Sequence, residues 1–476
     1  MRGSSTSWSR SEGASIRPST SRWACREAQR RYGRGGRGLS GLWSRAAAVA
    51  ARTPESRNRY VDFLRALSIG AVVVGHWIQA APYTGGGDIA LSSVLEHQSW
   101  TRWLTWVFQV MPIFFLVGGY SNGVSWQSAR DKGKSYAEWL QVRLRRLLGP
   151  VQLLLGVWML LAIGMALGGV DAGFVGDLSQ MALIPGWFLA VYVMVVLVVP
   201  LTYAAWRRYG LWSFWVLVAA AVVDDVLFLA ADLTVVGWAN YAFIWVAVHQ
   251  LGYAWRDGYA AGLRRGVAWA ALGAAALVGM VTLGPYPVSM VSVPGDAISN
   301  SLPPKLPMLA LALVHTGLLL SIEGPMRRWL DRSVPWTATV LVNGMIMTIF
   351  LWHLTAATLV IGAALLVGGL GLGVDPATGG WWAVRPLWIV VYALVLVPCV
   401  LAFGGLERRG GAGRTRPGWL LATGATVACA GLALLALGGV AAAGGGPFGL
   451  RLDVLVLAFV GAELAGANPL ARARTG

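Results

Sequence analysis

The chain has 476 residues, of which 56% are apolar and only 12% are charged. This composition excludes a water-soluble globular domain, because stretches of about 20 apolar residues recur along the chain, as membrane-crossing helices require. The net charge of +17 would suit a nucleic-acid-binding protein, but basic residues in a membrane protein usually encode orientation instead, so we expect membrane lipids and no nucleic acid as partners.

The first 58 residues are rich in Ser, Gly and Arg and hold no apolar run long enough for a membrane span or a signal-peptide core. We interpret residues 1–58 as a disordered, basic cytoplasmic tail. Two alternatives stay open: the tail could tether the protein to anionic lipids, or translation could start further along the chain. The tether would use a cluster of arginines, namely Arg26, Arg30, Arg31, Arg34 and Arg37.

Apolar stretches between charged residues predict eleven membrane spans. They lie near residues 64–83, 103–124, 147–168, 182–204, 211–231, 238–255, 266–284, 306–322, 338–361, 386–404 and 417–440. A twelfth, near 450–466, is weaker because Arg451, Asp453 and Glu463 interrupt it. We therefore expect an all-α, polytopic transmembrane bundle of 11–12 spans, with a membrane domain over 59–404 and one or two further helices and a short tail over 405–476.

Every second loop between the predicted spans is basic. These loops hold Arg130, Lys132, Lys134, Arg143, Arg145, Arg146, Arg207, Arg208, Arg256, Arg264, Arg265, Arg327, Arg328, Arg332, Arg408, Arg409, Arg414 and Arg416. The positive-inside rule places this side of the bundle, and with it the amino terminus, in the cytoplasm. We expect a multi-pass protein of the plasma membrane.

The first span contains two ionisable side chains that are costly to place in a bilayer, Arg65 and His76. Eleven residues at about 100° each bring His76 back to within roughly 20° of Arg65, about 16 Å further along the helix. Asp62 lies three residues before Arg65, close enough on a helix to pair with it. The alternative is an interfacial ion pair that anchors the helix end, with His76 simply hydrogen-bonded inside the bundle.

The same segment resembles the first-helix signature of the acyltransferase 3 family. The signature is carried by Arg59-Tyr-Val-Asp62-Phe-Leu-Arg65, followed by ten residues and His76. Weaker similarities follow in the family's order, at Met111–Tyr120, Arg143–Pro150, Trp187–Leu189 and Leu351–Leu354. The resemblance covers about residues 58–404, and the chain continues past it.

The resemblance implies a membrane enzyme that moves acyl groups onto hydroxyls of sugars and related acceptors. A neutral imidazole, with an ordinary pKa of about 6.5, suits the removal of the acceptor's proton. We therefore expect His76 to be the catalytic base, acting directly on the acceptor or through an acyl-imidazole. Asp62 would hold Arg65 in one geometry, and Arg65 would position an anionic or carbonyl group.

Arg143, Arg145 and Arg146 lie on the expected cytoplasmic side, where an acyl-CoA would arrive with its phosphates. Guanidinium groups suit phosphate oxygens, and the resemblance makes donor binding about equal to the alternative, a role in membrane orientation alone. We expect acyl-CoA with an acetyl or another short acyl group as the donor substrate, and no permanently bound cofactor. The acceptor partner would be a hydroxyl-bearing glycan, glycolipid or glycosylated small molecule.

Other polar groups in the predicted spans are further candidates. His353, Trp352 and Asn343 fall in the ninth span, where the resemblance favours a site-lining role, although a histidine bonded to a neighbouring helix is an equal alternative. Asp224 and Asp225 point about 100° apart, so at most one faces a shared cavity, and we take Asp224 as the candidate. No His, Cys or carboxylate cluster has metal-binding spacing, so we expect no metal.

Two other classes of protein fit parts of this pattern. Buried His, Asp and Arg in a bundle of this size also suit a proton-coupled secondary transporter or a flippase. Such proteins usually carry internal repeats, and we find none in this sequence. A purely structural scaffold is disfavoured by the ionisable residues inside the spans, so an integral membrane O-acyltransferase is our first hypothesis.

Overall fold

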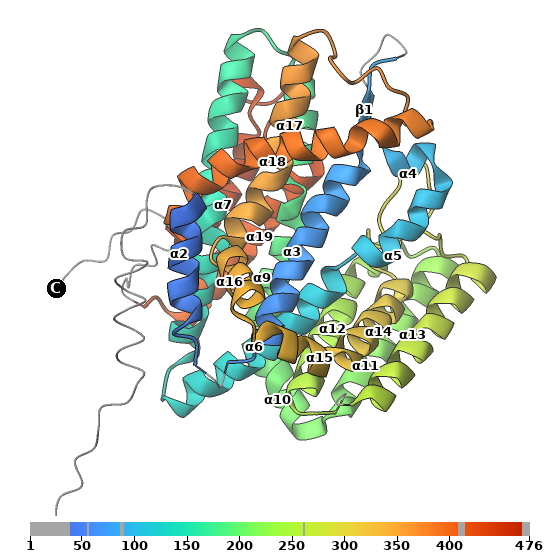
Figure 1. The fold of residues 1–476 in the computed structure, drawn as a ribbon, viewed down its shortest axis with the longest axis vertical. Helices are drawn as coiled ribbons and strands as arrows, with labels where there is room; N and C mark the ends of the chain where they lie inside the picture. Colours follow the sequence, from blue (N-terminus) through green and yellow to red (C-terminus); the bar gives the residue numbers. More distant parts are fainter. Residues whose placement is uncertain (1–38, 55–56, 86–89, 260–261, 408–414, 469–476) are drawn as a thin grey trace, which may run out of the picture.

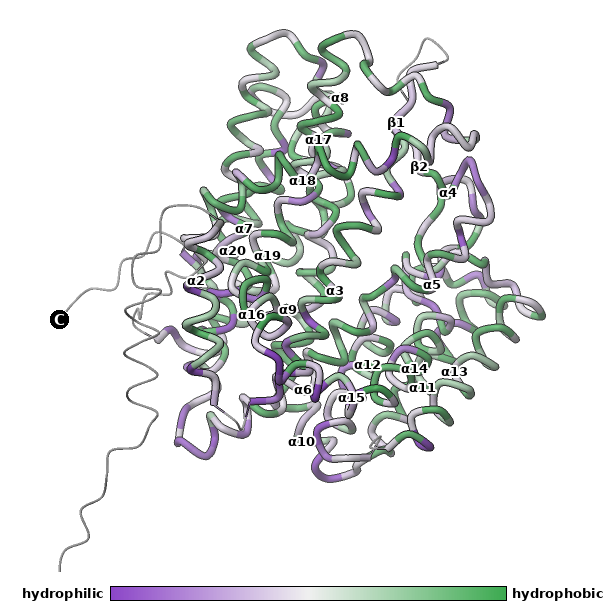
Figure 2. Tube along the Cα trace, viewed as in Figure 1, coloured by the Kyte–Doolittle hydropathy of each residue, from purple (hydrophilic) through white to green (hydrophobic). Residues whose placement is uncertain are grey.

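The computed structural model describes residues 39–54, 57–85, 90–259, 262–407 and 415–468. Within these ranges the chain is mostly helical, and its sheet is one antiparallel hairpin of β1 (Ala80–Tyr83) and β2 (Ala90–Ser93) (Figure 1). The helices are predominantly apolar along their length (Figure 2). The predicted all-α, polytopic fold class is confirmed.

Among the described residues, eight helical segments are long and apolar enough to cross a membrane. They are α3 (Arg59–Gln79), the continuous segment Ser99–Asp131, α7 (Tyr136–Leu167), α11 (Leu211–Ala230), α13 (Leu263–Leu283), α17 (Ile346–Leu366), α18 (Gly379–Glu407) and α19 (Gly418–Gly438). Two bent pairs raise this number to ten if each is one span: α8 (Ala172–Leu183) with α9 (Pro185–Leu197), bent by 49°, and α14 (Leu306–Ser321) with α15 (Glu323–Leu330), bent by 56°.

Within the described part of the chain, fewer helices are long and apolar enough to cross a membrane than the 11–12 spans predicted, for reasons that lie in particular segments. Pro185 cannot donate a backbone N–H to the preceding turn, so the expected 182–204 span is divided between α8 and α9 and continues into a separate α10 (Val199–Tyr209). The 238–255 segment forms α12 (Asn240–Arg256), which is only 17 residues long and is buried on nearly all sides. The weak twelfth segment forms α20 (Leu452–Leu464), of 13 residues.

The long segment Ser99–Asp131 consists of the 3-10 helix η1 (Ser99–Leu104), α5 (Thr105–Phe108) and α6 (Met111–Asp131). The remaining elements are short: α2 (Leu39–Ala50), α4 (Val94–His97), α16 (Ser333–Asn343) and the 3-10 helices η2 (Val236–Ala239) and η3 (Pro447–Gly449). Helix α2 corrects the expectation of disorder through residue 58, because its alanine-rich face packs against α16. The arginine cluster proposed as a lipid tether lies outside the described residues.

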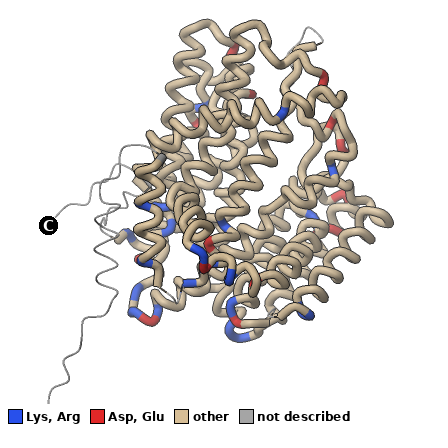
Figure 3. Tube along the Cα trace, viewed as in Figure 1, with Lys and Arg blue, Asp and Glu red and all other residues tan. Residues whose placement is uncertain are grey.

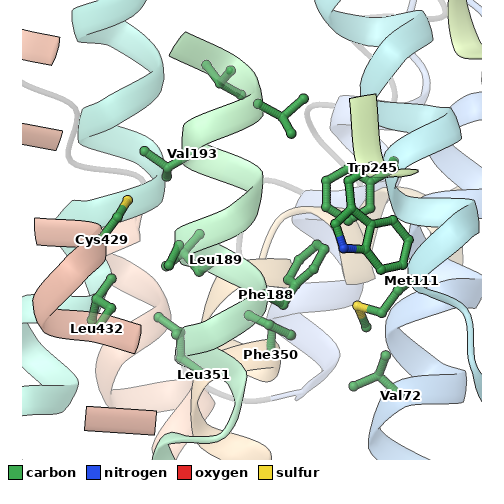
Figure 4. Close-up of a cluster of buried hydrophobic side chains, with 14 of the residues drawn as sticks. Val72, Met111, Phe188, Leu189, Val193, Trp245, Phe350, Leu351, Cys429 and Leu432 are labelled. Carbon is green, nitrogen blue, oxygen red and sulfur yellow. The ribbon is translucent and has the colours of Figure 1, made fainter. Parts of the chain in front are cut away.

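Helix α3 lies at the junction of two groups of helices (Figure 1). One group contains α11 to α14 and packs on α6 through α12; the other contains α7 to α9 and α17 to α20. Helix α3 packs against α6 on one side and against α16, α17 and α18 on the other. Side chains from both groups meet beside α9, which places the core next to α3 (Figure 4).

Lysine and arginine gather at one end of the bundle (Figure 3). Helix α3 begins at this basic end, where Arg59 donates to the carbonyl oxygen of Leu330, and it ends at β1. The C-terminal helices belong to the same bundle, because α19 packs against α7, α8 and α9 while α20 packs on α19. Small residues allow the close approach of these two helices: a Cβ on Gly461 would collide with the backbone of Ala428.

Candidate functional site

The first turn of α3 holds a network of charged side chains around Asp62. Asn58 caps the helix by accepting from the backbone N–H of Tyr60. The buried Asp62 carboxylate accepts from Arg65 at 3.1 Å and from Arg57 at 2.5 Å. Arg65 also donates to the hydroxyl of Ser121 on α6 at 2.8 Å. The predicted pairing of Asp62 with Arg65 is present, and it directs the guanidinium toward α6.

Fourteen residues after Asp62, the chain brings two histidines into contact. The Nδ1 atom of His76 lies 2.8 Å from the Nε2 atom of His353 on α17. The ring planes differ by only 5°, and the centroids are 5.2 Å apart. This separation matches the nitrogen-to-nitrogen distance plus two ring radii, so the rings lie edge to edge in nearly one plane. The contact is a directed hydrogen bond, and His353 is thus beside the proposed base.

The hydrogen-bond network assigns the tautomers of this pair when both rings are neutral. Nδ1 of His353 lies 2.7 Å from the carbonyl oxygen of Phe350, and a carbonyl can only accept, so this nitrogen carries the hydrogen. Nε2 of His353 must then accept, and Nδ1 of His76 donates to it. The remaining nitrogen of His76, Nε2, has a free lone pair. This is the arrangement that a general base or a nucleophile requires.

Two further contacts hold the C-terminal end of α3, one to α17 and one to α18. The indole N–H of Trp77 donates to the carbonyl oxygen of His353 at 3.0 Å. The guanidinium of Arg385, which is only 3% exposed, donates to the carbonyl oxygen of Trp77 at 2.7 Å and lies over the ring of Trp381. A cation at the C-terminal end of α3 also interacts favourably with the helix dipole. Arg385 therefore fixes the end of the helix that carries His76.

Arg65 and His76 have different neighbours, although they share one side of α3. Arg65 contacts α6 through Ser121, whereas His76 contacts α17 through His353. Both side chains are partly buried and keep some accessible surface. That the two groups line one common cavity stays a prediction.

The structure separates the other site-lining candidates from the histidine pair. Asn343 donates to the carbonyl oxygen of Asp62 at 2.8 Å, so it supports the charged first turn of α3. Trp352 stacks on Phe403 with centroids 4.1 Å apart and thereby turns toward α18. Asp224 is buried on α11, in a different part of the bundle.

The three adjacent arginines of α7 also have different surroundings. Arg143 turns inward, where it donates to Asn122 at 3.2 Å and to Ser125, and lies over the ring of Trp139. Arg145 donates to the carbonyl oxygen of Gly466, in the segment after α20. Arg146 is exposed.

Sequence reasoning missed three features of this region. Arg385 is not among the candidates of the sequence analysis, and the link from the C-terminal segment to Arg145 has no signal in the sequence. His249 is also absent from those candidates, yet it lies 3.2 Å from the amide nitrogen of Asn122, whose amide oxygen accepts from Arg143. The one usable signal was Arg385 itself, an arginine directly before a long apolar segment.

No group of three or more His, Cys, Asp or Glu side chains that could hold a metal ion occurs within the part of the chain that the structure describes. Neither cysteine described, Cys399 or Cys429, is in a disulfide.

Comparison with known proteins places this site in a family context. A model of the acyltransferase 3 family, described as an acyltransferase domain, matches residues 58–404. The matched part contains the whole of α3 and α17, and it ends within α18, before the two C-terminal helices. No curated protein and no solved structure matches the chain.

Proposed function

This chain belongs to the acyltransferase 3 family, and we propose that it transfers an acyl group from cytosolic acyl-CoA to a hydroxyl of a glycan, glycolipid or glycosylated metabolite. The family makes the protein an acyltransferase, and its many apolar helices make it a multi-pass membrane protein. The proposed acyl group is short, such as acetyl. The proposed location is the plasma membrane, with the amino terminus and the basic end in the cytoplasm.

The observation that carries the proposal is the free nitrogen of His76. Its Nδ1 donates to His353, which in turn donates to Phe350, so Nε2 is the nitrogen left to accept a proton. Positive charge that develops on His76 is then shared with a second imidazole rather than left isolated. A positioned base of this kind typically accelerates a reaction by about 10²- to 10⁴-fold.

The proposed reaction conserves atoms and charge. Nε2 of His76 accepts the hydroxyl proton as the acceptor oxygen attacks the thioester carbon. The tetrahedral intermediate then collapses, the carbon–sulfur bond breaks, and the imidazolium returns the proton to the sulfur of the departing CoA. In the second route, Nε2 attacks the thioester carbon, the carbon–sulfur bond breaks and CoA leaves as the thiolate. The acceptor hydroxyl then attacks the acyl-imidazole, the acyl–nitrogen bond breaks, and the hydroxyl proton neutralises the thiolate. The hydrogen bond to His353 serves either route.

The donor would approach from the basic end. Arg146 is the exposed member of the α7 arginines and is free to turn toward phosphate oxygens. Arg143 and Arg145 already donate to protein groups. Their contribution to donor binding would therefore be indirect, through the shape and the positive electrostatic potential of the basic end of the bundle. Arg65, held by Asp62, would position the carbonyl or an anionic part of the donor further along α3.

The decisive experiment measures release of free CoA by the purified full chain in detergent, with acetyl-CoA as the donor and a panel of sugar alcohols, glycosides and glycolipids as acceptors. The proposal requires CoA release that depends on the acceptor and yields an acylated product by mass spectrometry. If no acceptor supports release, while sealed vesicles containing the protein move an acceptor across the membrane, the transporter or flippase alternative replaces the proposal.

A further inference from the structure

A cleft lies between η1 and the long loop that joins α13 to α14. Its volume is about 780 Å³. Trp100, Arg102 and Trp103 line one wall, and Tyr286 and Asp296 line the other. The loop follows the end of α13 opposite to that helix's two arginines. The cleft therefore opens away from the expected donor entrance.

Two tryptophans form an aromatic platform on the η1 wall. Trp100 and Trp103 are three residues apart in a 3-10 helix, where such side chains eclipse each other about 6 Å apart along the axis. Another indole supports each from one side: Trp382 lies 5.4 Å from Trp100 and Trp106 lies 5.1 Å from Trp103, between ring centroids. The two platform residues remain 53% and 52% exposed. Supported indoles with an accessible face are suited to stack on a flat, partly apolar ring.

A charged pair spans the same cleft. Nη1 of Arg102 on η1 lies 3.4 Å from a carboxylate oxygen of Asp296 on the opposite wall, and both side chains are partly exposed. An ion pair this long leaves donor hydrogens and acceptor lone pairs available to a ligand. Vicinal hydroxyl groups match such a pair, since each hydroxyl both donates and accepts.

The loop wall is held in place by hydrogen bonds from the η1 and α5 side. The indole N–H of Trp106 donates to the carbonyl oxygen of Val288 at 2.8 Å, and the backbone N–H of Met290 donates to the hydroxyl of Thr105 at 2.8 Å. Gln109 donates to the carbonyl oxygen of Met290 at 3.1 Å. Loops of this length without secondary structure are usually either functional or disordered, and this one is anchored.

The loop is also anchored from the α11 side. The Tyr286 hydroxyl donates to Asp225 at 2.9 Å, and the fully buried ammonium of Lys305 lies 3.8 Å from the same carboxylate. Burial, followed by the nearby Asp225 carboxylate, raises the pKa of Tyr286, so its hydroxyl keeps the proton that it donates. The cleft is thus formed before any ligand arrives, which lowers the entropic cost of binding.

The segment that carries the platform packs against α3 next to the proposed base. Five residues after Trp103, Phe108 at the end of α5 packs against Gly75, so closely that a Cβ on Gly75 would lie 3.2 Å from the Phe108 ring. Gly75 precedes His76. The segment that carries the platform therefore contacts α3 at the residue before His76.

We infer that this cleft binds the acceptor as a pyranose ring, which stacks on the Trp100 and Trp103 platform while its hydroxyls contact Arg102 and Asp296. This inference rests on the proposed function for the role of the ring as acceptor. Tryptophans of a membrane-interface belt would account for exposed indoles, but not for a cleft whose two walls are joined by an ion pair and whose loop is anchored by hydrogen bonds.

The test measures binding without acyl transfer. A His76→Gln variant of the full chain, in a detergent without a sugar head group, is titrated with methyl glycosides of common hexoses and N-acetylhexosamines, with cyclohexanol as the non-sugar control. Saturation-transfer NMR reports which ligand protons contact the protein. We expect saturable binding of at least one glycoside and at least tenfold weaker binding in the Trp100→Ala/Trp103→Ala variant. The matched control is Trp212→Ala/Trp215→Ala, an exposed pair of the same spacing on α11, which binds unchanged.

Absence of glycoside binding above the cyclohexanol control overturns the inference, and so does equal binding in the two tryptophan variants. If the cleft variant does not fold, Asp296→Asn provides the same test, because it removes one charge without changing shape. We expect weaker glycoside binding in that variant, and unchanged binding overturns the inference. Failure of acceptor-dependent CoA release would refute the proposed function alone, since the NMR titration uses no acyl donor.

Discussion

The histidine pair lies on two helices, α3 and α17, and its side chains are in contact. The arginine triplet lies on one helix, α7, and its side chains have separate surroundings. His76 and His353 are 277 positions apart in the chain and share one hydrogen bond. Arg143, Arg145 and Arg146 lie within one turn, yet each has a different environment: the bundle interior, the C-terminal segment and the surface. Closeness in sequence therefore did not produce a common site, whereas the packing of α3 against α17 did.

The difference has a simple physical origin. A helix turns about 100° per residue, so consecutive residues point to different neighbours, and only spacings near a whole number of turns bring side chains together. On α7, Arg143 and Arg145 each donate to another part of the protein, because an unpaired charge inside a bundle is costly, whereas Arg146 faces outward. The comparison predicts large effects on catalysis at the histidines and small, separable effects at the arginines.

The largest expected effect follows the removal of the proposed base. His76→Ala should lower acyl transfer about 10³-fold, because Nε2 is the group that accepts the acceptor's proton. Turnover is measured as acceptor-dependent CoA release, and thermal unfolding of the purified variant serves as the control for folding. Turnover within a few-fold of the parent chain would remove His76 from the mechanism.

A smaller loss should follow the removal of its partner. In His353→Phe the ring volume is kept, but Nδ1 of His76 loses its acceptor, and we expect kcat to fall roughly 10- to 100-fold with little change in KM. The adjacent Trp352→Phe variant is the matched control, since Trp352 packs on Phe403 and has no contact with His76 in the ring geometry described. Equal effects of the two substitutions would mean that His353 acts only through packing.

Arg385 should have an intermediate effect through the end of α3. Arg385→Gln removes the guanidinium group that donates to the carbonyl oxygen of Trp77. We expect kcat to fall about tenfold while the acyl-CoA KM stays constant. Arg385→Lys keeps the charge and should recover part of the rate. A change confined to thermal stability would limit Arg385 to a structural role.

Substitutions in the arginine triplet should have the smallest effects on catalysis. They should change different quantities, the acyl-CoA KM for Arg146 and the thermal stability for Arg143. Arg146→Ala should raise the acyl-CoA KM about fivefold, the loss of roughly 1 kcal/mol of phosphate interaction. Arg143→Ala should instead lower the thermal stability, because Oδ1 of Asn122 and the hydroxyl of Ser125 both lose the donor that Arg143 supplies, at a cost of about 1 to 3 kcal/mol. Assays of donor dependence and of thermal unfolding on both variants distinguish these outcomes; the same change in donor KM for both would restore Arg143 as a direct phosphate ligand.

The sequence was informative where one helix contains the whole feature. The Asp62 to Arg65 pair follows from a spacing of three residues, and both it and the membrane-helical fold are confirmed. The predicted boundaries of the spans were wrong where hydropathy alone does not decide the structure. Pro185 divides one predicted span, and α12 is apolar because the bundle surrounds it. Leu39–Ala50 form a helix because α16 covers them. The partners of His76 and Arg145 depend on contacts across hundreds of residues, which no periodicity records.

The central claim is that His353 acts through His76, and a double-mutant cycle tests it most directly. The rates of acceptor-dependent CoA release are compared for the parent chain, His76→Ala, His353→Phe and the double variant. If the two imidazoles form one unit, loss of His353 costs nothing further once His76 is absent, and the double variant has the rate of His76→Ala. Independent losses that multiply in the double variant would contradict the account.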